Sequence, residues 1–534
     1  MVKKAKLALI GAEDEENLSI RYLAAVLKEN NHKVKIISCS KYEDFPRVLE
    51  EFKNFNPDIL AVSIAFQSLA LMFFEIIRKI KDISPEVHVT VGGHFPTFEY
   101  EKILNYDYID SVIRFEGEKP ILYLTEALIN GAELSNIPNL VYKNDELRKN
   151  SFNHYFPDLD RLPFPLRDEN PQMRLGENFT TLVTSRGCFH SKCIYCCIGA
   201  FHSKKNNKHV MRTPENVAME IAELHNSKKV NLFQFHDDNF LLPSKKLSLE
   251  RVESLKSALD KNINTDEIAL LIKTRPESID ESVVSALKGI GTVGAFMGVE
   301  NASVSGLRSL ARGSTIEDIE NSIEIFKNHE IAVTFNLLMF HPKTTLDEIN
   351  ENIYFMNKHA DHAFGFGRAE IVAGSPLERM VRRKQLLRGE WPSYDYKIED
   401  DSVEKMFRIS SLTFYKKGSL YPILSQEMIA IYYRVAMIKK LYPCKKSQKM
   451  AEKVNHLILE FNKFVLENIL EVYRLTAEME SNTRLNDLYR IIDEGCMFFR
   501  GEINDLSLKM GKFQMIQRKF NDMEINSKII KRLF

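Results

Sequence analysis

The chain has 534 residues, of which 44% are hydrophobic and 27% are charged. These are ordinary values for a globular protein, and the length suggests about three domains. Lysine plus arginine equals aspartate plus glutamate at 73 each, so the net charge favours neither a nucleic acid nor a membrane surface as a partner. The sequence also shows no signal peptide and no apolar run of the ~18 residues that a membrane helix needs. We therefore expect a soluble, cytoplasmic protein.

Apolar strand patterns alternate with helical patterns over about the first 130 residues. The expected strands are Lys6–Gly11, Lys33–Ser38, Asp58–Ile64, Val87–Val91 and Ser111–Arg114. Apolar strands separated by helices, such as Asn17–Glu29 and Leu69–Lys81, predict an α/β fold with a doubly wound parallel sheet. In such sheets ligands bind beyond the carboxyl ends of the strands.

A proline-rich linker, Asp158–Pro165, precedes a second series of strands and helices. Its expected strands are Phe179–Thr184, Val230–Phe235, Ala269–Thr274, Thr292–Val299, Ala332–Met339 and one within Ala363–Val372. About six such units predict a complete or partial (β/α) barrel. From about Glu399 the chain is nearly free of glycine and helical in period, which predicts a helical C-terminal domain. We thus expect domains at 1–145, 176–390 and 391–534, with a linker at 146–175.

The chain has seven cysteines, four of which lie between Cys188 and Cys197. An odd number with one tight cluster predicts a metal site in a reducing compartment rather than disulfides. Cys188, Cys193 and Cys196 follow the first barrel strand, and three thiolates on one loop can bind three irons of a 4Fe–4S cluster and leave the fourth iron open. The alternative is zinc, but a structural zinc needs four ligands, and the sequence offers no second Cys-x-x-Cys pair and only His190 nearby. We expect Cys197 to be a neighbour of the site and not a ligand.

The cysteine segment resembles the radical S-adenosylmethionine superfamily in Arg186-Gly187-Cys188 and in Cys193-Ile194-Tyr195-Cys196. The usual spacing in that family is Cys-x-x-x-Cys-x-x-Cys, with an aromatic residue just before the last cysteine. Tyr195 matches this aromatic residue, which the resemblance places near the adenine. Four residues instead of three separate Cys188 from Cys193, and a loop can absorb one extra residue at small cost.

Later strand ends resemble the same family, over about residues 178–377. The resemblance implies that S-adenosylmethionine is bound by Tyr195 together with polar residues at these strand ends, namely Asp237, Asp238, Asn239, Arg275 and Glu300. The alternatives are a helix cap for the two aspartates and a salt bridge for Arg275.

Two further segments resemble the Rossmann-like cobalamin-binding domain that precedes many radical enzymes. They are Gly92-Gly93-His94 and Glu116-Gly117-Glu118, each directly after an expected strand. The resemblance implies that these residues bind cobalamin, and the glycines would let the backbone approach a flat macrocycle closely. The histidine motif that binds cobalt in other cobalamin domains, Asp-x-His-x-x-Gly, is absent from the sequence. The alternative is a domain kept for packing.

Taken together, these resemblances imply a radical enzyme with a 4Fe–4S cluster, S-adenosylmethionine and cobalamin as cofactors. Such an enzyme takes an electron from a donor such as flavodoxin or ferredoxin, cleaves S-adenosylmethionine and abstracts a hydrogen atom from its substrate. With cobalamin, the expected reaction is methylation of an unactivated carbon in a small molecule or peptide. The alternatives are a cobalamin-free or non-methylating radical enzyme, which oxidises, cyclises or rearranges its substrate, and a non-catalytic metal-binding module.

The C-terminal domain is expected to cover the open face of the barrel and to shape the substrate pocket. Three aromatic residues at its start, Trp391, Tyr394 and Tyr396, could line that pocket or pack the junction between domains. Packing is the favoured interpretation.

Overall fold

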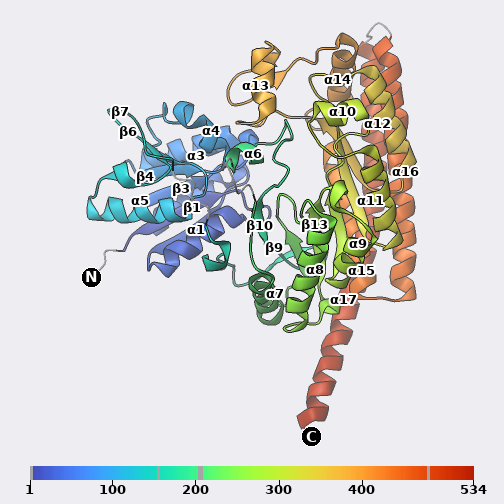
Figure 1. Ribbon diagram of the computed structural model, residues 1–534, viewed down its shortest axis with the longest axis horizontal. Helices are drawn as coiled ribbons and strands as arrows, with labels where there is room; N and C mark the ends of the chain where they lie inside the picture. The colour runs from blue at the N-terminus through green and yellow to red at the C-terminus, as the bar shows by residue number, and fades with distance from the viewer. Residues whose placement is uncertain (1–3, 153–156, 203–208, 478–481, 534) are drawn as a thin grey trace.

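The computed structural model describes residues 4–152, 157–202, 209–477 and 482–533. Three parts follow one another along the chain (Figure 1). An N-terminal sheet with its helices lies on one side, a second sheet with its helices lies in the middle, and long C-terminal helices lie on the far side.

The N-terminal sheet has seven strands in the order β2-β1-β3-β4-β5-β6-β7. The strands are β1 (Lys6–Gly11), β2 (Lys33–Ser38), β3 (Ile59–Ser63), β4 (His88–Gly92), β5 (Ser111–Ile113), β6 (Leu140–Asn144) and β7 (Glu146–Lys149). The first five are parallel, and β6 and β7 add an antiparallel edge. All five residues of β3 are buried, as expected for a central strand with helices on both faces. The predicted doubly wound sheet is therefore confirmed.

The helices of this domain are α1 (Leu18–Glu29), α2 (Phe45–Phe55), α3 (Ala70–Ile83), α4 (His94–Ile103) and α5 (Glu118–Asn130). Helix α4 follows β4 and helix α5 follows β5 through short turns at the carboxyl ends of those strands. The two cobalamin-like segments thus lie at the carboxyl edge of the sheet, on the same side as the topological switch point between the paired strands β1 and β3, where the strand order reverses.

The second sheet also has seven strands, in the order β16-β15-β14-β13-β12-β9-β8. Its strands are β8 (Gln172–Arg174), β9 (Glu177–Leu182), β12 (Leu232–Phe235), β13 (Ala269–Thr274), β14 (Thr292–Met297), β15 (Ala332–Phe340) and β16 (Phe364–Arg368). All neighbouring pairs are parallel except β8 with β9. The sheet is open between β16 and β8, so the predicted barrel is a partial one.

One face of this second sheet is covered by helices from the βα units. They are α7 (Pro214–Lys228), α8 (Lys245–Asp260), α9 (Glu281–Gly289), α11 (Ile316–Asn328) and α12 (Leu346–Lys358). Helix α7 begins as the sequence predicts: Thr213 accepts a hydrogen bond from the Asn216 N–H, and Pro214 occupies the first turn.

The C-terminal helices α14 (Asp401–Thr413), α15 (Tyr421–Leu441), α16 (Lys445–Ala477) and α17 (Asn482–Leu533) confirm the predicted helical domain. Helix α15 packs along β13 to β16. Its Tyr433 hydroxyl bonds to Thr334 of β15, and a Cβ at Gly294 of β14 would lie only 2.5 Å from the Tyr433 ring. Helix α15 therefore packs against the inner face of the partial barrel. None of the helices in the described ranges is long and apolar enough to cross a membrane.

Candidate active site between the two sheets

The cysteine loop begins at the carboxyl end of β9, where a buried aspartate from the neighbouring strand end holds it. The Asp237 carboxylate is fully buried and accepts hydrogen bonds from the Thr184 N–H at 2.7 Å and the Ser185 hydroxyl at 2.7 Å. The Thr184 hydroxyl also bonds to it. Asp237 thus fixes the direction in which the chain enters the cysteine segment.

The extra residue between Cys188 and Cys193 forms a local bulge at Ser191. Ser191 has a left-handed backbone with φ 49°, and its hydroxyl donates to the Cys188 carbonyl. The Ser191 carbonyl packs on the short helix α6 (Ile198–Phe201), where a Cβ at Gly199 would lie only 2.3 Å from it. The insertion is absorbed in a way that requires glycine at position 199.

Two buried arginines point at the sulfur of Cys193. Arg275 Nη1 lies 3.7 Å and Arg312 Nη1 lies 3.6 Å from Cys193 Sγ, and each arginine residue is only 4% exposed. The Ile198 N–H donates to Cys196 Sγ at 3.5 Å. Burial raises the pKa of the Cys193 thiol, and Arg275 opposes that rise. Donors and cations around the sulfurs suit thiolates, the form that binds metal.

The donor set of this loop fits a 4Fe–4S cluster. Cys188, Cys193 and Cys196 lie on one segment, and all are free thiols. Among the described residues, no three cysteine, histidine or acidic side chains converge on a single metal ion. A cluster does not need such convergence, since each thiolate binds a different iron. When bound, the cluster would supply the electron that cleaves S-adenosylmethionine.

Replacing Arg312 should make the reduction potential of a bound cluster more negative. The buried guanidinium stabilises negative charge at Cys193, and that charge grows when the cluster is reduced. We expect Arg312→Gln to lower the midpoint potential measured by an EPR-monitored redox titration of the reconstituted protein. Arg308→Gln, at an exposed position of helix α10 (Val304–Ser309), is the matched control. An unchanged midpoint in Arg312→Gln would show that this arginine does not act on the cluster.

The predicted S-adenosylmethionine residues occupy different environments. Burial raises the pKa of Glu300 to about 7, and the same cause raises the pKa of Asp238 to about 6. The Tyr195 hydroxyl counteracts the rise in pKa that burial causes at both Glu300 and Cys193, so these two predicted residues, Tyr195 and Glu300, lie near one another beside the cysteine loop. Asn239 is fully buried and donates to the Leu241 carbonyl. The contact of these residues with S-adenosylmethionine stays a prediction.

A cavity of about 600 Å³ lies between the two sheets. The predicted cobalamin residues all line it, and they are Gly92, Gly93, His94, Glu116, Gly117 and Glu118. Residues near the cysteine loop close it from the barrel side, among them Arg186, His236 and Asp238. The two groups of residues that the sequence assigns to different cofactors therefore face one another.

The lining of this cavity fits a large polar ligand such as cobalamin. The Thr90 hydroxyl and one oxygen of Glu118 are buried without a hydrogen-bond partner, although both residues line the cavity. Gly93 has φ 111°, and a Cβ there would lie 2.7 Å from the Ile64 carbonyl, so only glycine suits this turn. Burial lowers the pKa of His94 to about 4, which leaves its imidazole neutral. A bound cobalamin would supply a methyl group for transfer.

Arg186 connects the cavity to the cysteine loop, and sequence reasoning gave it no role. Its guanidinium donates to Glu116 at 2.5 Å and pairs with Glu118 at 2.7 Å, and it lies over the Tyr22 ring. Burial raises the pKa of Glu116 to about 7, while Arg186 opposes that rise. Because Arg186 lies two residues before Cys188, this contact ties the N-terminal domain to the cysteine segment.

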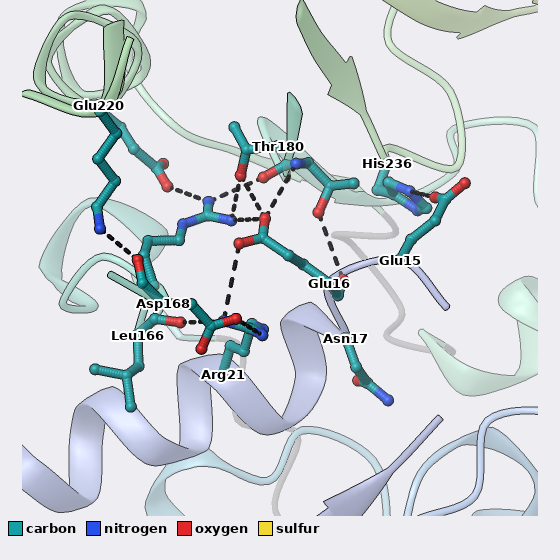
Figure 2. Close-up of polar contacts among 12 residues, drawn as sticks. Glu15, Glu16, Asn17, Arg21, Leu166, Asp168, Thr180, Glu220 and His236 are labelled. Carbon is teal, nitrogen blue, oxygen red and sulfur yellow. Dashed lines mark hydrogen bonds and ion pairs between the residues drawn. The ribbon is translucent and has the colours of Figure 1, made fainter. Parts of the chain in front are cut away.

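A second interdomain contact is a buried network of ion pairs (Figure 2). Glu16 of the N-terminal domain accepts from the linker residue Arg167 at 2.5 Å and also binds Thr180 of β9. Arg167 in turn donates to Glu220 of helix α7 at 2.7 Å, and Arg212 donates to the other oxygen of Glu220 at 2.5 Å. Figure 2 shows Glu16 between Arg21 and Thr180, and His236 against Glu15. Sequence reasoning missed this network because its members are scattered along the chain.

Fold and site together define a two-cofactor α/β protein, with a cobalamin-type domain facing a cysteine loop on a partial barrel. The family model for the B12 binding domain matches residues 10–124, and that for the radical SAM superfamily matches residues 182–356. The chain belongs to the radical S-adenosylmethionine superfamily and carries an N-terminal B12-binding domain. Its cofactors are accordingly S-adenosylmethionine, a 4Fe–4S cluster and cobalamin, and it is a radical enzyme.

Relatives and solved structures agree with this assignment. An uncharacterized methyltransferase of Pyrococcus horikoshii is 27% identical over 414 residues, which cover 74% of this chain and 87% of that protein. An anaerobic magnesium-protoporphyrin IX monomethyl ester cyclase of Synechocystis is 26% identical, over 47% of this chain and 50% of the cyclase. The cobalamin-dependent S-adenosylmethionine radical enzyme OxsB has the same fold, with a TM-score of 0.67 at 17% identity over 96% of this chain and 84% of that structure. The methyltransferase TsrM of Kitasatospora setae has a TM-score of 0.60 at 16% identity, over 72% of this chain and 75% of that structure.

Proposed function

We propose that the protein methylates an unactivated carbon of a small molecule or peptide. The observation that carries this proposal is the shared cavity, in which cobalamin-type residues and residues beside the cysteine loop line one space. A methyl donor held there would lie next to the site of radical formation. Among the relatives, the Pyrococcus protein is named as a methyltransferase, which supports the same reaction.

The roles of the chain's own residues follow from their positions. Cys188, Cys193 and Cys196 would hold the cluster, and the pair Arg275 and Arg312 would stabilise its charge. The residues 92–94 and 116–118 would orient cobalamin. Burial of the site between the two sheets excludes water, which protects reactive species from side reactions. We also propose that a one-electron donor such as flavodoxin or ferredoxin supplies the electron to the cluster. The protein would then act in a reducing compartment such as the cytoplasm.

The test is anaerobic incubation of the reconstituted protein with cobalamin, S-adenosylmethionine and a reductant. Radical methyl transfer consumes one S-adenosylmethionine to abstract hydrogen and another to supply the methyl group. We therefore expect deoxyadenosine and S-adenosylhomocysteine to form together. When the S-adenosylmethionine carries a deuterated methyl group, we expect that group to be transferred away from it. Deoxyadenosine alone, with cobalamin bound, would contradict methylation and favour the alternative reactions of oxidation, cyclisation or rearrangement. The match to a cyclase makes cyclisation the specific alternative.

A further inference from the structure

A second cavity, of about 710 Å³, lies inside the partial barrel. Strands β15 and β16 form one wall, and helices α14 and α15 form the other. A volume of this size suits a drug-sized small molecule. The C-terminal helices thus do shape a pocket against the open edge of the barrel.

This barrel cavity is adjacent to both cofactor sites. Ser63 at the end of β3 and Phe66 in the loop after it line the cobalamin cavity. The next residues of that loop, Gln67 and Ser68, line the barrel cavity. On the barrel side, Glu300 exchanges backbone hydrogen bonds with the cavity wall, to Asn336 at 3.1 Å and from Leu338 at 2.6 Å. A molecule in the barrel cavity would therefore be close to the proposed site of radical formation.

Aromatic side chains line the cavity, and a glycine of strand β16 leaves space between them. The aromatic lining includes Phe366, Tyr394, Tyr396, Phe407, Tyr415 and Tyr421. Gly367 of β16 lines the same space, and a Cβ there would meet only the Tyr415 hydroxyl, at 3.9 Å. Aromatic walls favour a flat ring by offset or edge-to-face packing.

Arg368 is the buried charge of this cavity. Its side chain is only 9% exposed, and its guanidinium lies 3.6 Å from the ring centre of Tyr396 and 4.2 Å from that of Phe407. Nη1 pairs with Asp395 at 2.6 Å and Nη2 donates to the Tyr396 carbonyl, but the Nε–H is buried without a partner.

The carboxylates near Arg368 lie toward solvent. The Asp395 side chain is 55% exposed, and Glu370, which also lines the cavity, is exposed. The cavity lining thus combines aromatic rings with a guanidinium whose Nε–H has no hydrogen-bond partner. An oxygen of a ligand would satisfy that donor, and a negative charge on the ligand would strengthen the bond.

We propose that the barrel cavity binds a flat aromatic molecule carrying a carboxylate or another oxygen anion, and that Arg368 binds the anion. This inference rests on the proposed function, because it identifies the occupant of the cavity as the substrate. It narrows the substrate from any small molecule or peptide to an aromatic acid or an aromatic phosphate. Arg368 is then a specificity-determining residue.

The test measures binding to the cobalamin-loaded holoenzyme with two fluorescent naphthalenes. 8-Anilinonaphthalene-1-sulfonate is anionic, and N-phenyl-1-naphthylamine is its neutral counterpart. We expect Gly367→Leu to weaken both about tenfold or more by filling the cavity. We expect Arg368→Gln to weaken only the anionic probe by about tenfold or more, since one hydrogen bond to a charged group is lost. Gly501→Leu, on helix α17 with no atom within 4 Å of its Cβ position, should change neither.

Several outcomes would overturn the inference. The first is that the anionic probe does not bind, or that Gly367→Leu does not weaken its binding. The second is that Arg368→Gln weakens the binding of both probes equally. Competition by 1-naphthoate and by 1-naphthyl phosphate then separates a carboxylate site from a phosphate site. Deoxyadenosine and S-adenosylhomocysteine formation, measured on the same samples, reports the proposed function independently, so failure of one is distinguishable from failure of the other.

Discussion

Replacing Cys188, Cys193 or Cys196 by alanine will leave the chain without a 4Fe–4S cluster, whereas replacing Cys197 will not. Each of the three thiolates would bind a different iron, so the two remaining thiolates cannot replace the one that is lost. We expect each single variant to lose most of its iron and sulfide and to form no detectable deoxyadenosine. Iron and sulfide analysis with the 400-nm absorbance of the reconstituted protein measures the first effect.

Cys197 is the matched control because it has the same side chain on the same loop. It is buried at the start of α6, where its carbonyl accepts from the Ala200 and Phe201 N–H groups, and these backbone bonds survive replacement by alanine. Cluster loss in Cys197→Ala, or full cluster in Cys196→Ala, would contradict the ligand assignment. Zinc in place of iron and sulfide would revive the zinc alternative.

The strands were predictable because short runs rich in apolar and β-branched residues between helical patterns are a strong local signal. β1 and β2 have the predicted bounds, and β3 lies within the predicted strand. The hairpin β6–β7 was missed because all four residues of β7 are exposed and show no apolar pattern. An edge strand of this kind is held by its partner's backbone rather than by burial, so its sequence carries little information.

The cysteine loop was predictable because its residues are contiguous, and the strand-end residues were predictable by resemblance. Arg312 was not, because 119 positions separate it from Cys193 and only the fold joins them. Asp237 and Asp238 look alike in sequence but differ in place. Both carboxylates hold the cysteine loop, Asp237 through the Thr184 N–H and Asp238 through the Gly187 N–H at 3.1 Å, but of the two only Asp238 lines the cofactor cavity.

The aromatic residues before α14 show the same limit. The favoured interpretation, packing, holds for Trp391, whose ring stacks on Phe74 at 5.7 Å in the N-terminal domain. It also holds for Tyr396, which is 1% exposed in the core, and for Tyr394, which contacts Lys102 of the N-terminal domain. Both tyrosines line the barrel cavity as well. Three aromatic residues within six positions look alike in the sequence. The turn between them nevertheless places Trp391 against the N-terminal domain and the two tyrosines at the barrel cavity.

Replacing Glu220 by alanine will destabilise the protein more than any surface change on the same helix. The Glu220 side chain is 2% exposed, and its two oxygens pair with Arg167 and Arg212, whose side chains are 8% and 2% exposed. Removing the carboxylate leaves two buried guanidinium groups without this partner, a change that costs about 3–5 kcal/mol. The expected result is a lower midpoint in thermal and urea unfolding of the cofactor-free protein. Glu223→Ala, at an exposed position of α7, should shift the midpoint little.

The effect should extend to cobalamin, because the network sets how the two sheets face one another. Arg167 binds Glu220 on one side and Glu16 on the other, and Glu16 itself lines the cobalamin cavity. We therefore expect Glu220→Ala to bind cobalamin more weakly at temperatures where it is still folded, as measured by equilibrium dialysis. If Glu220→Ala and Glu223→Ala unfold at the same midpoint, the network does not hold the domains together. If only stability falls and cobalamin affinity is kept, the other contacts between the sheets, such as Arg186 with Glu116, suffice to hold the cavity in shape.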